Sequence, residues 1–382
     1  MIMASIGTTF NVFIDELMAA GGRILELPLF MLLAVIGAFG LALVLGARRL
    51  SRKGSSVSTV RVVLVAGLVL GLLAVAMAAD RKFQRLQTSV IELRTKTSTE
   101  AATLLNIVSK MQTKRRSFLF SLPEVQKELA ETLGEVTIQP TIYDEATDFA
   151  RIVIKRPLAQ VFVAVVDLRN PAVEIKLGGM LDKKTLTSAF ARENDCTVAI
   201  NGEAGMSPMA NSWLGDWKGN LVELGQVLLR ESTKYPAPFL SFDRQNHADF
   251  TSAASTNRTL TPTQYNVTWG RWDALVNGAI PSGIDSRNRQ PRTAMAISQD
   301  GSRLYLLVAD GRQPSYSNGM TMAGVGQCLQ SFGAYNGMGC DEGGSSCIYL
   351  KQFGGIANIP CDNAGQERAT YTHFGIRLLE AK

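Results

Sequence analysis

Histidine and cysteine are scarce in this sequence, and their spacing argues against a zinc site. The only histidines, His247 and His373, lie far apart, and the five cysteines include no C-x-x-C pair. A structural zinc site needs closely spaced pairs of such ligands. All five cysteines lie after residue 195, where an oxidising compartment would allow disulfides. Their odd number leaves at least one unpaired, and the pairing cannot be read from the sequence.

Basic residues are in excess, but they do not form a pattern typical of nucleic-acid binding. The formal net charge is +6, and clusters at 48–61, 81–85 and 114–116 supply much of it. No stretch interleaves basic residues with aromatic residues that could stack on bases. Anionic lipid head groups explain such clusters beside a membrane. We therefore expect a lipid bilayer as a partner and no nucleic acid.

Charge is absent from two long apolar stretches, 29–47 and 62–79. Each is long enough for a helix to cross a hydrocarbon core of about 30 Å. They lie back to back and too deep in the chain for an ordinary signal peptide, so they predict a two-helix transmembrane hairpin. The connecting loop, 48–61, has five basic residues and no acidic one. The positive-inside rule therefore predicts a membrane protein with two spans and an extracytoplasmic C-terminal domain, periplasmic or on the cell surface.

Composition divides the chain into four regions. Residues 1–28 form an amphipathic N-terminal segment, 29–79 carry the two transmembrane helices, 80–139 form a helical stalk, and 140–382 form the extracytoplasmic domain. Between residues 83 and 111, apolar residues recur on heptad steps. This pattern fits a helix that self-associates into a homo-oligomer, and it fits equally an amphipathic helix that packs on its own domain.

The C-terminal region predicts an α+β fold, a mixed β-sheet domain with flanking helices, because predicted strands outnumber helices. Runs rich in β-branched residues predict strands at 151–155, 161–167, 173–177, 196–201, 221–230, 239–243, 293–298, 304–310 and 370–379. Helices are predicted at 121–134, 186–194 and 320–332. For the first of these, Ser121 and Glu124 are expected to form a capping box. A linker is expected at 140–148 and a loop at 251–270.

Four polar clusters end or follow predicted strands, and strand-end loops can converge on one pocket. The clusters are 201–203, 289–292, 310–319 and 341–346. Together they hold carboxylates, guanidiniums and hydroxyls. Arginine matches phosphate geometry with two parallel hydrogen bonds, and a pair of carboxylates is the minimum requirement for glycoside cleavage.

The stretch from Asp341 to Ser346 (Asp-Glu-Gly-Gly-Ser-Ser) allows two interpretations. Its glycine N–H groups and serine hydroxyls could form an anion-binding nest beside a carboxylate that does acid–base or nucleophilic work. Alternatively, it is a tight turn before a strand, in which Asp341 and Ser345 satisfy local backbone groups.

The order of these motifs resembles the phosphodiester glycosidase family over about 155–380. The resemblance rests on Arg292-Thr-Ala-Met-Ala-Ile, on segments 304–319, 333–336 and 341–346, on Ala199-Ile-Asn-Gly, and on Glu367-Arg368. It implies a hydrolase of the glycosidase type. The family pattern Asp-Gly-Gly-Gly-Ser has Glu342 here in place of its first glycine. Either the backbone at Glu342 tolerates a side chain, or the site has been rebuilt.

The resemblance and the clusters together predict a membrane-anchored extracytoplasmic glycosidase. It would hydrolyse a sugar-1-phosphodiester or a related glycosidic bond in a surface glycan such as an exopolysaccharide. Asp341 or Glu342 is expected as the acid/base or nucleophile, with Asp310 as the partner carboxylate. The residues expected to bind substrate are Asn201, Glu203, Arg292, Arg312, Ser317, Gly343, Gly344, Ser345 and Ser346.

Two other interpretations stay open. The protein could be a non-catalytic glycan-binding or scaffold protein of an envelope polysaccharide system. It could also hold a divalent cation between Glu203, Asp310, Asp341 and Glu342, although no motif demands a cofactor.

Overall fold

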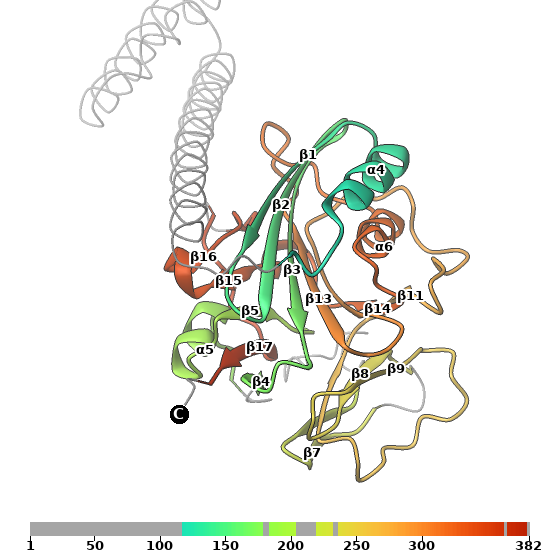
Figure 1. Cartoon of the computed structure of the whole chain (residues 1–382), viewed down its shortest axis with the longest axis vertical. Helices are drawn as coiled ribbons and strands as arrows, with labels where there is room; N and C mark the ends of the chain where they lie inside the picture. Colours follow the sequence, from blue (N-terminus) through green and yellow to red (C-terminus); the bar gives the residue numbers. More distant parts are fainter. Residues whose placement is uncertain (1–116, 179–182, 204–218, 232–235, 363–364, 380–382) are drawn as a thin grey trace, which may run out of the picture. The chain divides into compact units, whose positions relative to one another are not determined.

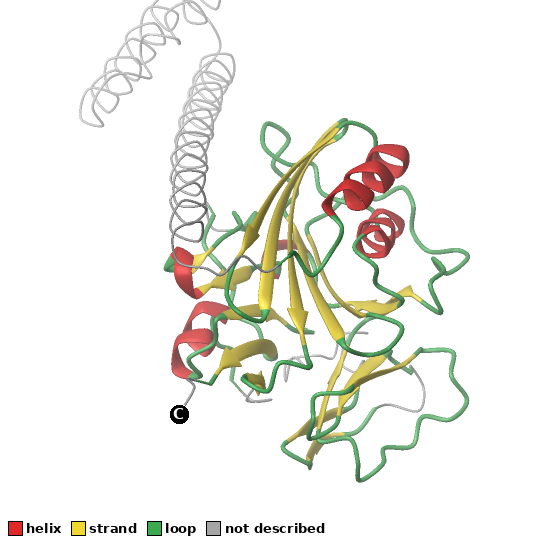
Figure 2. Ribbon diagram, in the orientation of Figure 1, coloured by secondary structure: helices red, strands yellow, loops and turns green. Residues whose placement is uncertain are grey.

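A computed structural model describes residues 117–178, 183–203, 219–231, 236–362 and 365–379 (Figure 1). These residues all lie in the second of two compact units, 1–89 and 90–382. Strands dominate and helices are few (Figure 2), which confirms the predicted α+β class. In the described ranges, no helix has both the length and the apolar character needed to cross a membrane. The spans predicted at 29–47 and 62–79 and the heptad pattern at 83–111 lie outside these ranges.

The strands form three sheets, and the neighbours within each sheet are antiparallel. The seven-stranded sheet has the order β1 (Val136–Ile142), β2 (Thr147–Lys155), β3 (Leu158–Asp167), β13 (Arg303–Ala309), β12 (Arg292–Ile297), β14 (Asn336–Gly339), β11 (Trp272–Leu275). One five-stranded sheet has the order β7 (Gln226–Leu229), β6 (Leu221–Glu223), β10 (Asn266–Trp269), β8 (Phe239–Phe242), β9 (Ala248–Thr251). The other has the order β16 (Gly355–Ile356), β15 (Ile348–Leu350), β5 (Val198–Asn201), β17 (His373–Leu378), β4 (Val173–Gly178).

Both faces of the seven-stranded sheet are covered. Along β3, Val161, Val163 and Val165 face the core shared with α4 (Leu122–Leu133) and α6 (Met322–Ser331). Phe162 and Ala164 face the opposite core, which includes residues of β4, β5, β15 and β17. Because successive side chains of a strand point to opposite faces, a strand buried on both sides is a continuous apolar run. This explains the unbroken apolar character of segment 161–166.

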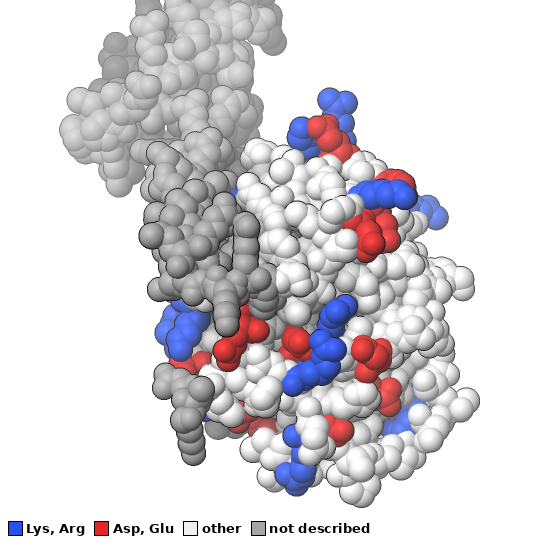
Figure 3. All heavy atoms as spheres, viewed as in Figure 1, with Lys and Arg blue, Asp and Glu red and all other residues white. Residues whose placement is uncertain are grey.

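The remaining helices are short. Helix α5 (Thr187–Glu193) packs on β5 and β15, and the 3₁₀ turns η2 (Gly343–Ser345) and η3 (Lys351–Phe353) flank β15. On the face seen in Figure 3, acidic and basic side chains are interspersed among uncharged residues. The five cysteines all lie in the described ranges and are free thiols; only Cys361 is not fully buried.

Three expectations need correction. The mixed sheet is replaced by three antiparallel ones, because short hairpins such as that between β12 and β13 join antiparallel neighbours. The expected linker at 140–148 is wrong: β1 runs through Pro140, which an edge strand tolerates. The expected loop at 251–270 includes β10, whose residues are all buried at the centre of a sheet.

The start of the domain also differs from the predicted arrangement. Helix α4 begins after Ser121, but the Ser121 side chain makes no capping hydrogen bond, so the capping box does not form. Val125 and Leu129 of this helix are buried in the same core as α6 and β3. The boundary predicted between residues 139 and 140 lies inside β1. Residues 122–142 therefore pack as part of the sheet domain.

Replacing Leu129 with alanine should test this packing. Leu129 is fully buried, so Leu129→Ala should lower the free energy of unfolding by about 2–5 kcal/mol. The exposed neighbour Glu128 is the matched control, and Glu128→Ala should change stability by less than about 0.5 kcal/mol. Urea unfolding of the two variants measures the difference. Equal stabilities would show that α4 does not contribute to the core.

Candidate active site

The predicted site residues lie where strand ends from two of the three sheets meet. In the seven-stranded sheet, Arg292 pairs with Ala309 and Ala294 pairs with Gly339, so the loops after β13 and β14 lie beside the start of β12. The end of β5 joins them, because the Asn201 side chain donates to the backbone carbonyl of Asp341 (3.0 Å). The four clusters that we expected to converge therefore lie at one edge of the molecule.

Asn201 holds the loop after β14 in place. Its Nδ2 donates to the carbonyls of Gly202 (3.2 Å) and Asp341, and its Oδ1 accepts from the Thr293 hydroxyl (2.8 Å) and the Cys347 N–H (3.1 Å). A side-chain amide offers two donors and one acceptor oxygen with two lone pairs. Asn201 is fully buried and its capacity is used within the protein. The geometry thus favours a positioning role for Asn201 over direct contact with a substrate.

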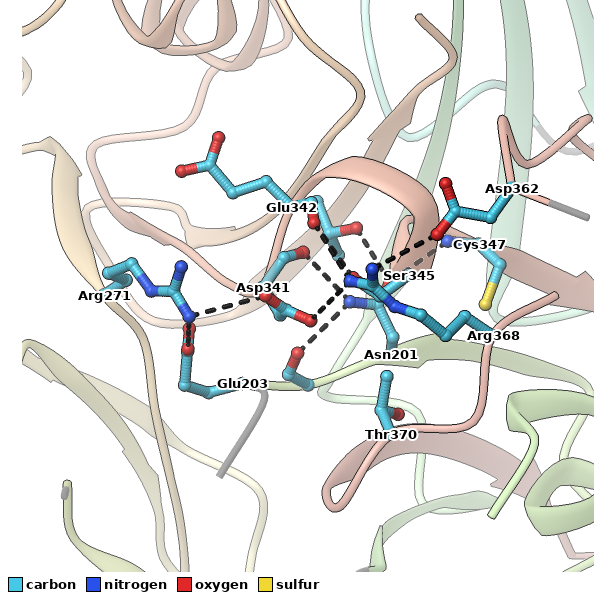
Figure 4. Close-up of polar contacts among 12 residues, drawn as sticks. Asn201, Glu203, Arg271, Asp341, Glu342, Ser345, Cys347, Asp362, Arg368 and Thr370 are labelled. Carbon is cyan, nitrogen blue, oxygen red and sulfur yellow. Dashed lines mark hydrogen bonds and ion pairs between the residues drawn. The ribbon is translucent and has the colours of Figure 1, made fainter. Parts of the chain in front are cut away.

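Asp341 is the carboxylate at the centre of the site (Figure 4). Its Oδ1 lies 3.4 Å from Arg271 Nη2, and its Oδ2 lies 3.5 Å from Arg368 Nη2. Arg271 comes from the turn between β10 and β11, and Arg368 from the segment before β17. The side chain of Arg368 is 44% exposed and also pairs with Asp362 (3.2 Å). Asp341 therefore faces two guanidiniums, one of them open to solvent.

Glu203 places a second carboxylate beside the guanidinium of Arg271. It forms an ion pair with Nη2 of Arg271, the nitrogen that also contacts Asp341. Burial disfavours the charged form of Arg271, but the carboxylates of Glu203 and Asp341 outweigh it, so the pKa of Arg271 is raised. The structure thus unites Asp341 with Glu203, which we had expected only to bind substrate.

Glu342 points away from the Asp341 carboxylate (Figure 4) and forms an ion pair with Nη1 of Arg292. Its backbone is extended, with φ −123° and ψ 177°, a conformation that any residue adopts. Of the two alternatives raised by the missing glycine, the backbone therefore tolerates a side chain here. Arg292 is buried, and its Nε and Nη2 donate to the carbonyls of Met320 (3.1 Å) and Asn288 (3.0 Å).

The turn requires glycine at the next two positions, Gly343 and Gly344. Gly343 has φ +77°, in the left-handed region that favours glycine. A Cβ on Gly344 would lie 1.8 Å from the Asp362 carboxyl carbon, so a side chain there would displace Asp362. Arg312, exposed and itself at φ +57°, packs against Gly343 and donates to Gln290 Oε1 (2.7 Å).

Asp310 lies in a separate, closed network. Its carboxylate accepts hydrogen bonds from Asn358 Nδ2 (2.7 Å), the Ile359 N–H (2.9 Å) and the Tyr316 hydroxyl (3.1 Å). Burial raises its pKa to about 7. Its link to the site is indirect, since Asn358 also donates to the carbonyl of Ser346 (3.0 Å). This geometry favours a structural role for Asp310 over that of partner carboxylate.

The hydroxyls of Ser317 and Ser345 form hydrogen bonds with backbone groups. The Ser317 hydroxyl donates to the carbonyl of Asp310 (2.5 Å) and accepts from the Gln160 N–H. The Ser345 hydroxyl donates to the carbonyl of Glu342 (3.2 Å). Ser346 is buried, and its hydroxyl has no hydrogen-bond partner among the described residues. Of the three, only Ser346 retains an unused hydroxyl beside the site.

Sequence reasoning missed Arg271 and Asp362, and it noted Arg368 only as part of a motif. Neither Arg271 nor Asp362 belongs to a recognisable pattern, because each reaches the site through tertiary packing. Glu367, the neighbour of Arg368, instead accepts from the Ser188 N–H of α5 (2.9 Å). Across the described part of the chain, no three His, Cys, Asp or Glu side chains converge to hold a metal ion. The four carboxylates proposed for a cation are therefore not gathered in one place.

Comparison with known proteins supports the family resemblance. Residues 194–377 match the phosphodiester glycosidase family. A hypothetical protein from Synechocystis is similar in structure, with 11% identity, a TM-score of 0.49 and coverage of 64% of each chain. The catalytic domain of zebrafish N-acetylglucosamine-1-phosphodiester α-N-acetylglucosaminidase is similar with 18% identity and a TM-score of 0.46, covering 64% of this chain and 83% of that one. Curated proteins give no significant match.

The buried carboxyl of Asp310 should make stability depend on pH. Its pKa is about 7 in the folded state against 3.8 ordinarily, so the folded protein binds this proton more tightly. Its contribution to stability is complete below about pH 4 and falls by up to about 4 kcal/mol as the pH rises to 7. Asp310→Asn cannot titrate and should lack this fall. Urea unfolding between pH 4 and 8 measures both proteins, and curves of the same shape would refute the assignment.

Proposed function

We propose, from the premise that residues 194–377 form a domain of the phosphodiester glycosidase family, that this protein is a glycosidase. It would hydrolyse a sugar-1-phosphodiester or a related glycosidic bond in a surface glycan. The observation that carries the proposal is the pair of carboxylates, Asp341 and Glu203, that contact one nitrogen of Arg271. Two nearby carboxyl groups are what glycoside cleavage requires.

The two carboxylates would have different roles in the reaction. In glycoside cleavage, one carboxyl group protonates the leaving-group oxygen, and the other attacks the anomeric carbon or activates a water. Asp341 faces two guanidiniums, an environment suited to the carboxylate that acts as nucleophile or base. Glu203 then replaces Asp310 as the partner, because Asp310 is closed within its own network.

Arginines at the rim would bind the substrate. The exposed side chains of Arg312 and Arg368 offer guanidinium groups beside the turn at Gly343 and Gly344. Guanidiniums bind phosphoryl oxygens with parallel hydrogen bonds, and they also donate to sugar hydroxyls. Asn201 and Thr293 would fix the loop that carries Asp341 during the reaction.

Asp341→Asn should abolish hydrolysis while leaving the fold intact. The amide cannot accept a proton or attack carbon, so turnover should fall at least about a hundredfold. A panel of aryl sugar-1-phosphodiesters and aryl glycosides measures turnover, and circular dichroism measures folding. Asp195→Asn is the matched control, because Asp195 is an exposed carboxylate that pairs with Lys351 on the surface, and turnover should not change.

Unchanged turnover in Asp341→Asn would refute the assignment of Asp341. Absence of turnover in the native protein, combined with binding of glycan fragments, would favour the alternative of a non-catalytic glycan-binding protein. That alternative draws its support from Glu342, which stands where the family pattern has a glycine.

We also propose that segments 29–47 and 62–79 anchor the domain in a membrane, with the domain outside the cytoplasm. The uncharged runs and the basic loop between them support this orientation. A reporter enzyme that is active only outside the cytoplasm, fused after Lys382, should be active. Activity of a cytoplasmic reporter at the same position would reverse the orientation.

A further inference from the structure

Arg292 has an unusual environment for a residue expected to bind substrate. Its side chain is only 2% exposed. Two backbone carbonyls accept hydrogen bonds from Nε and Nη2, and these contacts fix the plane of the guanidinium. The remaining nitrogen, Nη1, faces Glu342. The guanidinium is therefore held rigidly, with a single position left for an anion.

Glu342 fills that position from the solvent side. Its side chain is 13% exposed, whereas Arg292 behind it is almost completely covered. The Glu342 backbone is extended and the two following glycines form the turn, so this side chain is not required by the conformation of the loop. Removing its charge would leave the buried guanidinium of Arg292 without its ion-pair partner.

A second guanidinium lies close to this position. Arg312 packs against Gly343. Burial lowers the pKa of Arg292 to about 10, and the positive charge of Arg312 lowers it as well. Arg312 bonds to the neutral Gln290. No ion pair of Arg312 is found among the described residues. Glu342 is thus the carboxylate that contacts Arg292 directly, while the charge of Asp285 also acts on this guanidinium.

We propose that Glu342 is a built-in anion that occupies the Arg292 guanidinium, so that the site selects glycosides carrying no anionic group at this position. The inference rests on the proposed glycosidase function, and it narrows the substrate class from sugar-1-phosphodiesters to neutral glycosidic linkages. A phosphoryl group arriving beside Arg292 would meet the Glu342 carboxylate and be repelled. A neutral sugar or aglycone would meet a pair of groups whose charges already cancel.

The anion affinity of Glu342→Gln tests this inference without requiring catalysis. Glutamine has nearly the same size but carries no charge, so it pairs with Nη1 only through a neutral hydrogen bond that an anion can displace. We expect this variant to bind inorganic phosphate at least about tenfold more tightly than the native protein, equivalent to about 1.4 kcal/mol. Isothermal titration calorimetry at low ionic strength measures the affinity. Adding Arg312→Gln should remove much of the gain.

Glu231→Gln is the matched control for loss of a carboxylate. Glu231 pairs with Arg258, and its side chain is 17% exposed, close to the 13% of Glu342. This variant should bind phosphate no better than the native protein. Glu342→Gly provides a second test, because glycine can also adopt the extended backbone at this position. This variant should show the same gain in phosphate affinity as Glu342→Gln. Equal phosphate affinity in the native protein and both Glu342 variants would overturn the proposal, as would failure of both variants to fold.

Turnover separates this inference from the proposed function. If the native protein hydrolyses aryl glycosides, its preference for them over aryl sugar-1-phosphodiesters, as a ratio of kcat/KM, should fall at least about tenfold in Glu342→Gln. An unchanged ratio would refute the role of Glu342 while leaving the glycosidase assignment in place. Absence of turnover in every variant would refute the glycosidase assignment, and phosphate binding would still decide the role of Glu342.

Discussion

The structure of the site depends on the four hydrogen bonds of one buried amide, that of Asn201. Three of them join the end of β5 to the start of β12 and to both ends of the 341–347 loop, and the fourth goes to the carbonyl of the adjacent Gly202. The Gly202 carbonyl also accepts from the Asp341 N–H, but the other three partners would lose this hydrogen bond if the amide were absent, and unsatisfied polar groups are costly to bury. The amide therefore fixes the loop in one arrangement, and it sets the position of Asp341 relative to the arginines.

Around this fixed loop, carboxylates and guanidiniums alternate in a series of ion pairs. Glu203 and Asp341 share Arg271, Asp341 and Asp362 share Arg368, and Glu342 pairs with Arg292. The two carboxylates of the loop, Asp341 and Glu342, thus pair with different guanidiniums, and their side chains point in different directions. A carboxylate held between two cations keeps its orientation without solvent reorganisation, which is the form of electrostatic preorganisation that favours catalysis.

Sequence reasoning predicted the parts of this arrangement that depend on local pattern. The apolar run in β3 and the polar residues at strand ends follow from alternation and from turn chemistry, and register then brings Arg292, Asp310 and Asp341 to one edge. The rest depends on tertiary contacts. The donors that close around Asp310 come from Asn358 and Ile359, 48 and 49 residues further along. Arg271 reaches Asp341 across 70 residues, and no local signal marks it.

The difference between local pattern and tertiary contact also explains why the role of Glu342 could not be predicted from the sequence. A glycine replaced by glutamate within a glycine-rich turn suggests strain, yet the left-handed residue is Gly343, and the close approach to Asp362 belongs to Gly344. The first position of the turn is extended and accepts any side chain. The substitution therefore adds charge without altering the backbone. Because Arg292 is buried directly beside Glu342, the proposed effect of that charge is on the recognition of anions, and the turn that carries Asp341 does not require a glycine at this position.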